Sequence, residues 1–150
     1  MALKIDEKDQ KILEVLREHA DYATRQIAKK TGLPITTVHN RVSKLKKEKI
    51  IKRFTVEVDH NLLHEGFRAY VLVSVNLSLL KEKKKSQYDV AKELKHFSFV
   101  EKADIVSGGT DIVATVRVKD VAEFDRVLLT KLQRIEGIEK TQSLIVIHEE

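Results

Sequence analysis

Residues 31–51, TGLPITTVHNRVSKLKKEKII, combine regularly spaced apolar residues with hydroxyl, amide and cationic side chains. Ile35, Val38, Val42 and Leu45 follow the spacing of a helix that buries one stripe of its surface. The spacing therefore predicts an amphipathic helix whose other side can contact a partner rich in acceptors or negative charge. The side chains expected on that other side, or along its flanks, are Thr36, Thr37, His39, Asn40, Arg41, Ser43, Lys44 and Lys47.

These side chains have the chemistry of a protein that contacts double-stranded DNA. In the major groove, threonine, asparagine and lysine can reach base edges, and asparagine pairs well with adenine. Neighbouring cations would contact phosphates, which fix register and affinity rather than sequence. The alternative is that the charged residues form only a solvated face. We assign phosphate contacts to Lys29, Lys30, Lys44, Lys46, Lys47, Lys52 and Arg53, and we include Arg25 among the DNA-binding residues.

A second candidate site lies far downstream, at Ser107-Gly108-Gly109-Thr110-Asp111. Glycines let backbone N–H groups approach a carboxylate closely, and Asp111 could pair with an ammonium group. A zwitterion such as an amino acid is therefore a reasonable guest for this segment. The alternative is an ordinary hairpin turn without a ligand.

Charge is distributed unevenly along the 150 residues. Residues 1–53 hold 14 Lys and Arg against 7 Asp and Glu, whereas residues 54–150 hold 14 against 16. This asymmetry indicates a module that binds a polyanion, joined to a neutral or slightly acidic one. The chain has no cysteine, which excludes disulfides, thiolate metal sites and a cysteine nucleophile.

No apolar run approaches the roughly 20 residues that a membrane helix needs, and the first residues lack the pattern of a signal peptide. We therefore expect a cytoplasmic protein that does not contact a membrane. No nucleophile elbow, phosphate loop or paired-carboxylate pattern is present, so we expect neither an enzyme nor a cofactor. His60 and His64 are four residues apart, but two ligands without a third make a poor metal site.

Three helices are predicted before residue 50. The first covers residues 6–18 and follows an acidic cap. The second covers residues 25–31, with Thr24 as its cap and Gly32 as its end, because glycine tolerates a left-handed backbone. The third begins at or near Pro34, whose fixed φ suits the first turn of a helix.

The segment after these helices reads as a strand. Residues 50–59, IIKRFTVEVD, alternate apolar and polar side chains, and Lys52 and Arg53 lie near their start. We expect a small basic wing here. A short helix, a glycine turn, a longer helix and a wing form the geometry that places one helix in a major groove.

The second half of the chain predicts a β-α-β-β-α-β order, the ferredoxin-like arrangement. The two central strands are joined by the glycine turn, and Asp120 and Glu123 have the spacing of a capping box. Gly137 is expected to end the second helix. The expected strands cover residues 68–77, 99–107, 111–118 and 138–150; the first expected helix contains Val90, Ala91, Leu94 and Phe97 and follows a lysine-rich turn at 81–85, and the second covers residues 120–135.

Two of these strands are apolar on both faces, in the stretches YVLV and LIVI. A sheet that carries both helices on one face should instead alternate apolar and polar residues. The helix-free face is therefore expected to be covered by a second copy in a symmetric dimer. The alternative is two hydrophobic strands that lie under loops.

Several stretches resemble the leucine-responsive/asparagine-regulator (Lrp/AsnC) family of transcription regulators. Ala28, Gly32 and Val38 stand where helix-turn-helix units have a small residue, a turn glycine and a buried aliphatic residue. The stretches IDEKDQKILEVL, TRQIAKKTGL, TTVHNRVSKLKKEKII and VSGGTDIVATVRV resemble this family in the right order over nearly the whole chain. Two positions differ from its pattern: Pro34-Ile35 replaces a serine cap, and Gly109 replaces a polar residue.

The resemblance implies an α+β protein with a winged helix-turn-helix at residues 1–58, a linker at 59–67 and a ferredoxin-like domain at 68–150. It also implies a homodimer that could assemble into a tetramer or octamer, a palindromic DNA operator, and an amino acid or related small molecule as effector. Two alternatives remain: a siroheme decarboxylase on the same fold, and a ligand-binding module that does not bind DNA. A coloured protein would favour the first, and failure to retard DNA at low salt the second.

Overall fold

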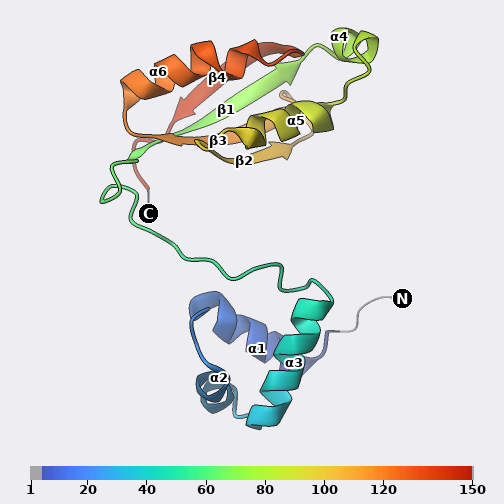
Figure 1. Ribbon diagram of the computed structural model, residues 1–150, viewed down its shortest axis with the longest axis vertical. Helices are drawn as coiled ribbons and strands as arrows, with labels where there is room; N and C mark the ends of the chain where they lie inside the picture. The colour runs from blue at the N-terminus through green and yellow to red at the C-terminus, as the bar shows by residue number, and fades with distance from the viewer. Residues whose placement is uncertain (1–4, 150) are drawn as a thin grey trace. The chain divides into compact units, whose positions relative to one another are not determined.

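The computed structural model describes residues 5–149, and the chain divides into two compact units between Val58 and Asp59 (Figure 1). Each unit has a hydrophobic core of its own. Within the described residues, no helix is long and apolar enough to cross a membrane.

The first unit consists of three helices, α1 (Glu7–Glu18), α2 (Thr24–Thr31) and α3 (Ile35–Lys47). Asp6 and Asp9 form a reciprocal capping box at the start of α1, and Gly32 ends α2 with a left-handed φ of 70°. Pro34 caps α3, as expected from its fixed φ. Each helix contributes two buried residues to the core: Ile12, Leu16, Ile27, Ala28, Val38 and Leu45.

Three local predictions for this unit are wrong. Ala23, not Thr24, caps α2, and its N–H donates to Gln26 Oε1 at 2.8 Å, so a side chain inside the helix replaces the expected hydroxyl cap. Ile35 is 49% exposed because it lies in the first turn of α3, before the stripe reaches the core. Residues 52–58 form neither strand nor helix, since no other strand of the described chain pairs with them.

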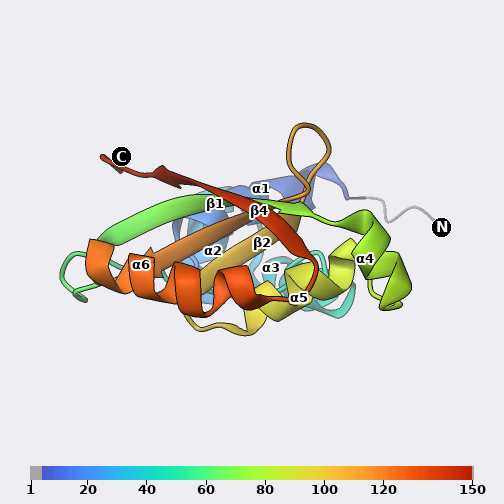
Figure 2. The same cartoon turned by 90° about the horizontal axis from the view of Figure 1, so that it is seen from above.

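The second unit is a four-stranded antiparallel sheet with helices on one face (Figure 2). The strand order β2-β3-β1-β4 and the order of elements confirm the ferredoxin-like prediction. Buried residues from three of the strands and from the helices build one core, and Ile138 of the remaining strand packs against it. The elements are β1 (Phe67–Val75), α4 (Leu77–Glu82), α5 (Gln87–His96), β2 (Val100–Ile105), β3 (Ile112–Val118), α6 (Val121–Thr130), the short 3₁₀ helix η1 (Leu132–Arg134) and β4 (Ile138–Ile145).

The element boundaries differ from the predictions in several places: α6 ends at Thr130 and η1 follows it, where one helix over residues 120–135 was expected, and α5 ends at His96, before Phe97. Helix α4 was not predicted: Leu77 was expected to end the first strand and residues 81–82 to begin the lysine-rich turn. Instead, Asn76 caps the helix by accepting the Leu79 N–H at 2.9 Å, and Leu80 anchors it in the core. The last strand ends at Ile145 rather than continuing to residue 150, which lies outside the described residues. The glycine turn does join β2 and β3, where the Val106 N–H donates to the Asp111 carbonyl at 2.9 Å.

The helix-free face of the sheet carries apolar side chains. Along β1, Ala69, Val71, Val73 and Val75 are buried under the helices, whereas the residues between them are only half-buried. On the edge strand β4, Leu144 pairs with Tyr70 and is 47% exposed. The side chains that give this face its apolar character are Tyr70, Leu72, Val113 and Leu144.

Candidate functional site

Helix α3 presents a continuous polar surface to solvent. Val38 and Leu45 are fully buried, so they fix the helix against α1 and α2 and define which side faces out. Thr37 and Arg41 lie half-buried on the flanks, as their helical positions predict. His39, also predicted on a flank, is exposed, and so are the residues predicted to face away from the stripe: Thr36, Asn40, Ser43, Lys44 and Lys47.

The start of α3 leaves backbone donors without a side-chain cap. Pro34 has no side chain that could accept a hydrogen bond, and the first helical bond runs from the Val38 N–H to the Pro34 carbonyl at 3.0 Å. The N–H groups of the first turn therefore have no side-chain acceptor. Helix N-termini of this kind can bind anions, which is compatible with the phosphate contacts expected from the sequence.

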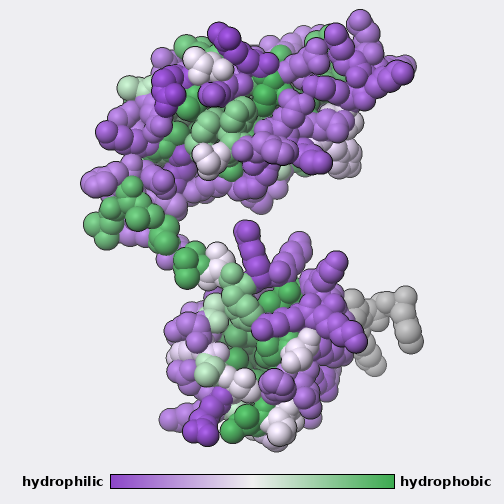
Figure 3. Space-filling model, in the orientation of Figure 1, coloured by the Kyte–Doolittle hydropathy of each residue, from purple (hydrophilic) through white to green (hydrophobic). Residues whose placement is uncertain are grey.

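The remaining predicted phosphate contacts are also exposed, and one of them is held in place. Lys46 Nζ lies 4.9 Å from the centre of the Phe54 ring, which brings the end of α3 together with the segment that follows it. That segment continues with exposed hydrophobic residues, visible in Figure 3 along the chain after α3. The other cations outside α3 to which DNA contacts were assigned are also exposed: Arg25, Lys29, Lys30, Lys52 and Arg53.

Arg41 has an internal partner that sequence reasoning missed. Its guanidinium donates to Asp6 and, at 3.2 Å, to Asp9, so it links α3 to the capping box of α1. The Asp9 side chain is 1% exposed. The only signal in the sequence was the position of Arg41 three residues after buried Val38, which places it beside the core. In the folded chain, Arg41 therefore serves to hold α3 against the start of α1.

Removing this guanidinium should destabilise the first unit in a pH-dependent way. The pKa of Asp6 is lowered because its carboxylate accepts the Asp9 N–H and the Arg41 guanidinium, which together outweigh desolvation. A lowered folded-state pKa contributes stability well above the ordinary value of 3.8 and loses it as the pH falls through the folded value. We expect Arg41→Gln to lower the thermal midpoint of this unit at neutral pH, and by less in acid.

Circular dichroism melts at pH 7 and pH 3 would measure this. Lys44→Gln, a charge loss at an exposed position of the same helix, is the matched control and should have the smaller effect at neutral pH. Equal losses for Arg41→Gln at both pH values would contradict the ion-pair explanation.

The hairpin turn at residues 107–111 is fixed to the end of β1. The Asp111 carboxylate accepts the Val75 N–H through Oδ2 and the Gln87 Nε2 amide through Oδ1, both at 2.9 Å. The Thr110 hydroxyl donates to the Val73 carbonyl at 2.9 Å. Asp111 therefore ties the turn to β1 and to the first residue of α5, a use of its carboxylate that differs from the expected pairing with an ammonium group.

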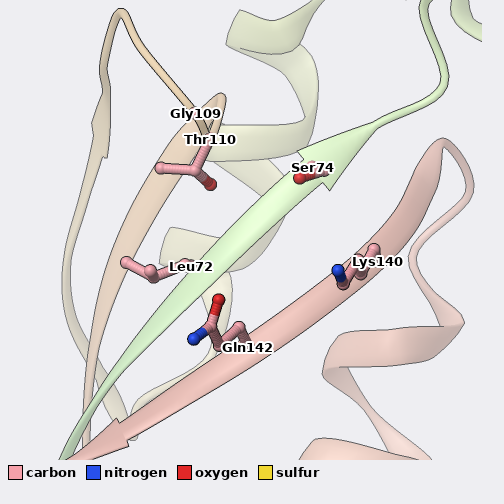
Figure 4. Close-up of a pocket in the computed structure, with 6 residues that line it drawn as sticks. All are labelled: Leu72, Ser74, Gly109, Thr110, Lys140 and Gln142. Atoms are coloured by element: carbon pink, nitrogen blue, oxygen red, sulfur yellow. The ribbon is translucent and has the colours of Figure 1, made fainter.

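A hollow of about 340 Å³ opens beside this turn on the helix-free face (Figure 4). Leu72 and Ser74 of β1 face Gln142 and Lys140 of β4, their register partners, across its floor. Gly109 and Thr110 close the end formed by the turn, and Ser107 and Gly108 precede them as exposed residues. The structure thus brings two residues of the predicted site together with four that sequence reasoning did not select.

The missed residues could have been found from the strand pattern. In β1 and β4, side chains at alternate positions share one face. Ser74 interrupts the apolar run of β1 and is the signal that marks the polar hollow, and its pairing with Lys140, two residues from Gln142 on the same face of β4, would have identified the other two.

The opposite end of the helix-free face carries a charged cluster. Arg68 and Arg117 are register partners, and Glu149 accepts hydrogen bonds from both, at 3.0 and 2.9 Å. Hydrogen bonds from Arg117 and Arg68 hold the pKa of Glu149 below its usual value. Arg117 Nε also donates to Glu101 at 2.6 Å. The cluster fastens the end of the described chain to the sheet.

The histidines considered as metal ligands do not converge. His60 Nδ1 lies 3.6 Å from Glu65 and its Nε2 lies 3.7 Å from Glu101, whereas His64 is exposed in a turn with a φ of 58°. Across residues 5–149, no group of three or more histidine, aspartate or glutamate side chains is arranged to hold a metal ion.

A three-helix unit with an exposed polar third helix, joined to a ferredoxin-like sheet, defines a DNA-binding transcription regulator of the helix-turn-helix class. The model of the winged helix-turn-helix DNA-binding family matches residues 5–52, and that of the Lrp/AsnC ligand binding domain matches residues 69–150. The chain belongs to the Lrp/AsnC family, which confirms the resemblance seen in the sequence.

The similarity to related proteins extends over nearly the full length of the chain. The chain is 31% identical to an HTH-type transcriptional regulator of Pyrococcus furiosus, covering 97% of this chain and 94% of that one. It is 31% identical to regulator FL11 of Pyrococcus horikoshii, with 98% and 92% covered. Among solved structures, E. coli AsnC has a TM-score of 0.83 at 26% identity, covering 98% of this chain and 95% of that one. A regulator of Neisseria meningitidis, solved in complex with L-Met, has a TM-score of 0.87 at 21% identity, covering 97% and 92%.

Proposed function

We propose that this regulator binds a palindromic operator as a homodimer or larger assembly, inserts α3 into the major groove, and is modulated by a small molecule held beside the 107–111 turn. The observation that carries the proposal is the side of α3 that packing leaves exposed, which holds an amide, hydroxyls and cations. A protein that binds the operator must act where the DNA is, which we take to be the cytoplasm. We assign it no catalytic step.

Within α3, we propose separate roles for its polar residues. Asn40, Ser43 and Thr36 read bases, because their short neutral side chains donate and accept hydrogen bonds. Lys44, Lys47 and the cations outside α3 neutralise phosphates. Arg41 is at most a secondary contact, because Asp6 and Asp9 already occupy its guanidinium.

A second copy is the proposed cover of the helix-free face. Tyr70, Leu72, Val113 and Leu144 leave that face apolar, and a two-fold axis would place the same patch of another chain against it. The unpaired segment 52–58 supports the same assembly, since Phe54, Val56 and Val58 alternate like a strand that lacks a partner. Larger assemblies, tetramers or octamers, would be built from this dimer.

The effector is proposed from the hollow and its surroundings. Its volume suits a molecule of amino-acid size, and its polar lining adjoins one apolar residue. The family model that matches this unit is a ligand-binding domain, and the Neisseria relative of the same fold was solved in complex with L-Met. An amino acid or a related small molecule therefore fits the proposal.

Footprinting and DNA titrations on the promoter of the protein's own gene test the DNA-binding part. Two protected major grooves should lie about 34 Å apart, or a multiple of that distance. If about six to eight cations per dimer reach phosphates, log affinity should fall against log salt with a slope of about −5 to −7. A slope near zero would contradict the proposal.

Two variants separate base reading from phosphate contact. Asn40→Ala should weaken the specific site by about 1–3 kcal/mol and random DNA much less, because it removes a base contact. Lys47→Ala should weaken both DNAs about equally and flatten the salt slope. Lys131→Ala, an exposed lysine of the second unit, is the control and should change neither. If Asn40→Ala weakened random DNA as much as the specific site, as Lys47→Ala should, Asn40 would not read bases.

A further inference from the structure

Carboxylates are unevenly placed in the first unit. Helices α2 and α3 contain no aspartate or glutamate, whereas Asp6, Glu7 and Asp9 lie at the start of α1. A surface that binds DNA phosphates is expected to exclude negative charge. Two carboxylates nevertheless reach α3, because Asp6 and Asp9 both accept hydrogen bonds from Arg41 Nη1. Among the ion pairs of residues 5–149, only these two involve a side chain of α3.

The cluster of Asp6, Asp9 and Arg41 has a formal charge of −1, since two carboxylates share one guanidinium. The Asp9 side chain is 1% exposed and that of Asp6 is 43% exposed, so the carboxylate that meets solvent is that of Asp6. The pKa of Asp6 lies below its ordinary value because its carboxylate accepts the Asp9 N–H and the Arg41 guanidinium. Asp6 is therefore ionised at neutral pH.

Arg41 lies where a free arginine would add to the affinity for DNA. It follows Asn40 on the half-buried flank of α3 and precedes the exposed Lys44 by three residues. Residues three apart on a helix are neighbours on its surface. The Arg41 side chain is 28% exposed, so part of it reaches solvent beside the polar surface of α3. Without its two carboxylate partners, this guanidinium would bind a phosphate strongly.

We propose that Asp6 and Asp9 determine specificity: by binding Arg41, they keep its guanidinium from contacting the phosphates of random DNA. The proposal rests on the proposed function, because it assumes that α3 enters the major groove. On an operator, base contacts fix the position of α3, so a freed Arg41 gains little. On random DNA, the helix can shift until a freed Arg41 meets a phosphate. Since specificity is a difference between two affinities, weakening the binding of random DNA increases it.

Asp6→Asn tests the proposal in the full-length chain. Asparagine caps helices about as well as aspartate, so the substitution removes the charge and keeps the cap of α1. Anisotropy titrations with a random-sequence duplex should show binding tightened by about 3- to 10-fold, the range of one or two exposed charge contacts per dimer. The slope of log affinity against log salt should steepen by about 0.9 per chain. Operator affinity should rise less. Damage to the fold would lower affinity, so a gain separates the proposed role from a structural one.

Three further variants isolate the contribution of Arg41. Glu7→Gln removes an exposed carboxylate of α1 that pairs with Lys11, and it should change the affinity for random DNA much less. Arg41→Gln in the Asp6→Asn background should abolish the gain, because no guanidinium is left to release. Asp6→Ser, a second uncharged cap, should reproduce the gain of Asp6→Asn. Circular dichroism melts set a temperature at which every variant is folded.

Several outcomes would overturn the proposal. Unchanged affinity for random DNA in Asp6→Asn would do so, and so would a gain that persists without Arg41, which would reflect only the general field of the unit. Weaker binding of both DNAs by the folded variant would mean that Asp6 orients Arg41 for a DNA contact. An equal gain on operator and random DNA would exclude a role in specificity. These results leave the proposed function in place, whereas a wild-type chain that binds no DNA would overturn both.

Discussion

Leu45→Ala should lower the free energy of unfolding of the first unit by about 2–5 kcal/mol, the usual range for a buried leucine. Leu45 has no exposed surface, and it belongs to a core with only six buried residues. Its backbone carbonyl also accepts the N–H groups of Ile50 and Ile51, at 3.0 and 3.1 Å, so a shift of Leu45 would disturb the turn that follows α3. A core this small has little other burial to compensate a cavity.

Hydrogen exchange would locate the effect. Amides of α1, α2 and α3 should lose protection in Leu45→Ala, whereas those of the sheet should keep it, because the two cores share no residue. Ile35→Ala is the control: it removes an aliphatic side chain from the same helix, but at a position that is half exposed. A loss for Ile35→Ala as large as that for Leu45→Ala would contradict the assigned core.

Gly137→Ala should destabilise the second unit by about 2–4 kcal/mol, from backbone strain and overpacking together. The φ of Gly137 is +101°, a conformation that other residues rarely adopt. A Cβ atom there would lie 2.3 Å from Leu80 Cδ2 and 3.6 Å from Val90 Cγ2, and both residues are buried. The Gly137 carbonyl also accepts the Asn76 N–H at 2.9 Å, so a shift would disturb the cap of α4.

Urea unfolding monitored by circular dichroism would measure the loss. Gly109→Ala is the matched control, because a Cβ added there meets no atom within 4 Å and its backbone is not strained. It should leave the free energy of unfolding nearly unchanged. Similar losses for both variants would show that the contact of Gly137 with Leu80 does not limit stability.

Most of the fold could be predicted because its local signals agree with its tertiary structure. The 3, 4, 3 spacing placed α3, Gly32 marked the end of α2, and the order of strands and helices predicted the sheet. Helix α4 was not predicted because its six residues are too few to show a helical period, and because a lysine-rich stretch follows it. Its cap, Asn76, was the available signal.

The site was less predictable because its key contacts join residues far apart in sequence. Arg41 has the type and position of a DNA contact, and only the fold reveals that Asp6 and Asp9 lie beside it. Asp111 likewise suits an ammonium partner until Val75 and Gln87 are placed next to it. Lys140 lacked a local motif, since it reaches the hollow through pairing of β4 with β1.

The last residues of the first unit have a practical consequence for the intact protein. Residues 52–58 form neither helix nor strand, and Lys52 and Arg53 are exposed at its start. Exposed, irregular backbone is where proteases cut, so trypsin should act here first. Cleavage would release a fragment that keeps the whole sheet but lacks the reading helix. In the proposed dimer, such a fragment would pair with an intact chain and leave the pair with a single DNA-binding unit, so cleavage of this segment is expected to weaken operator binding.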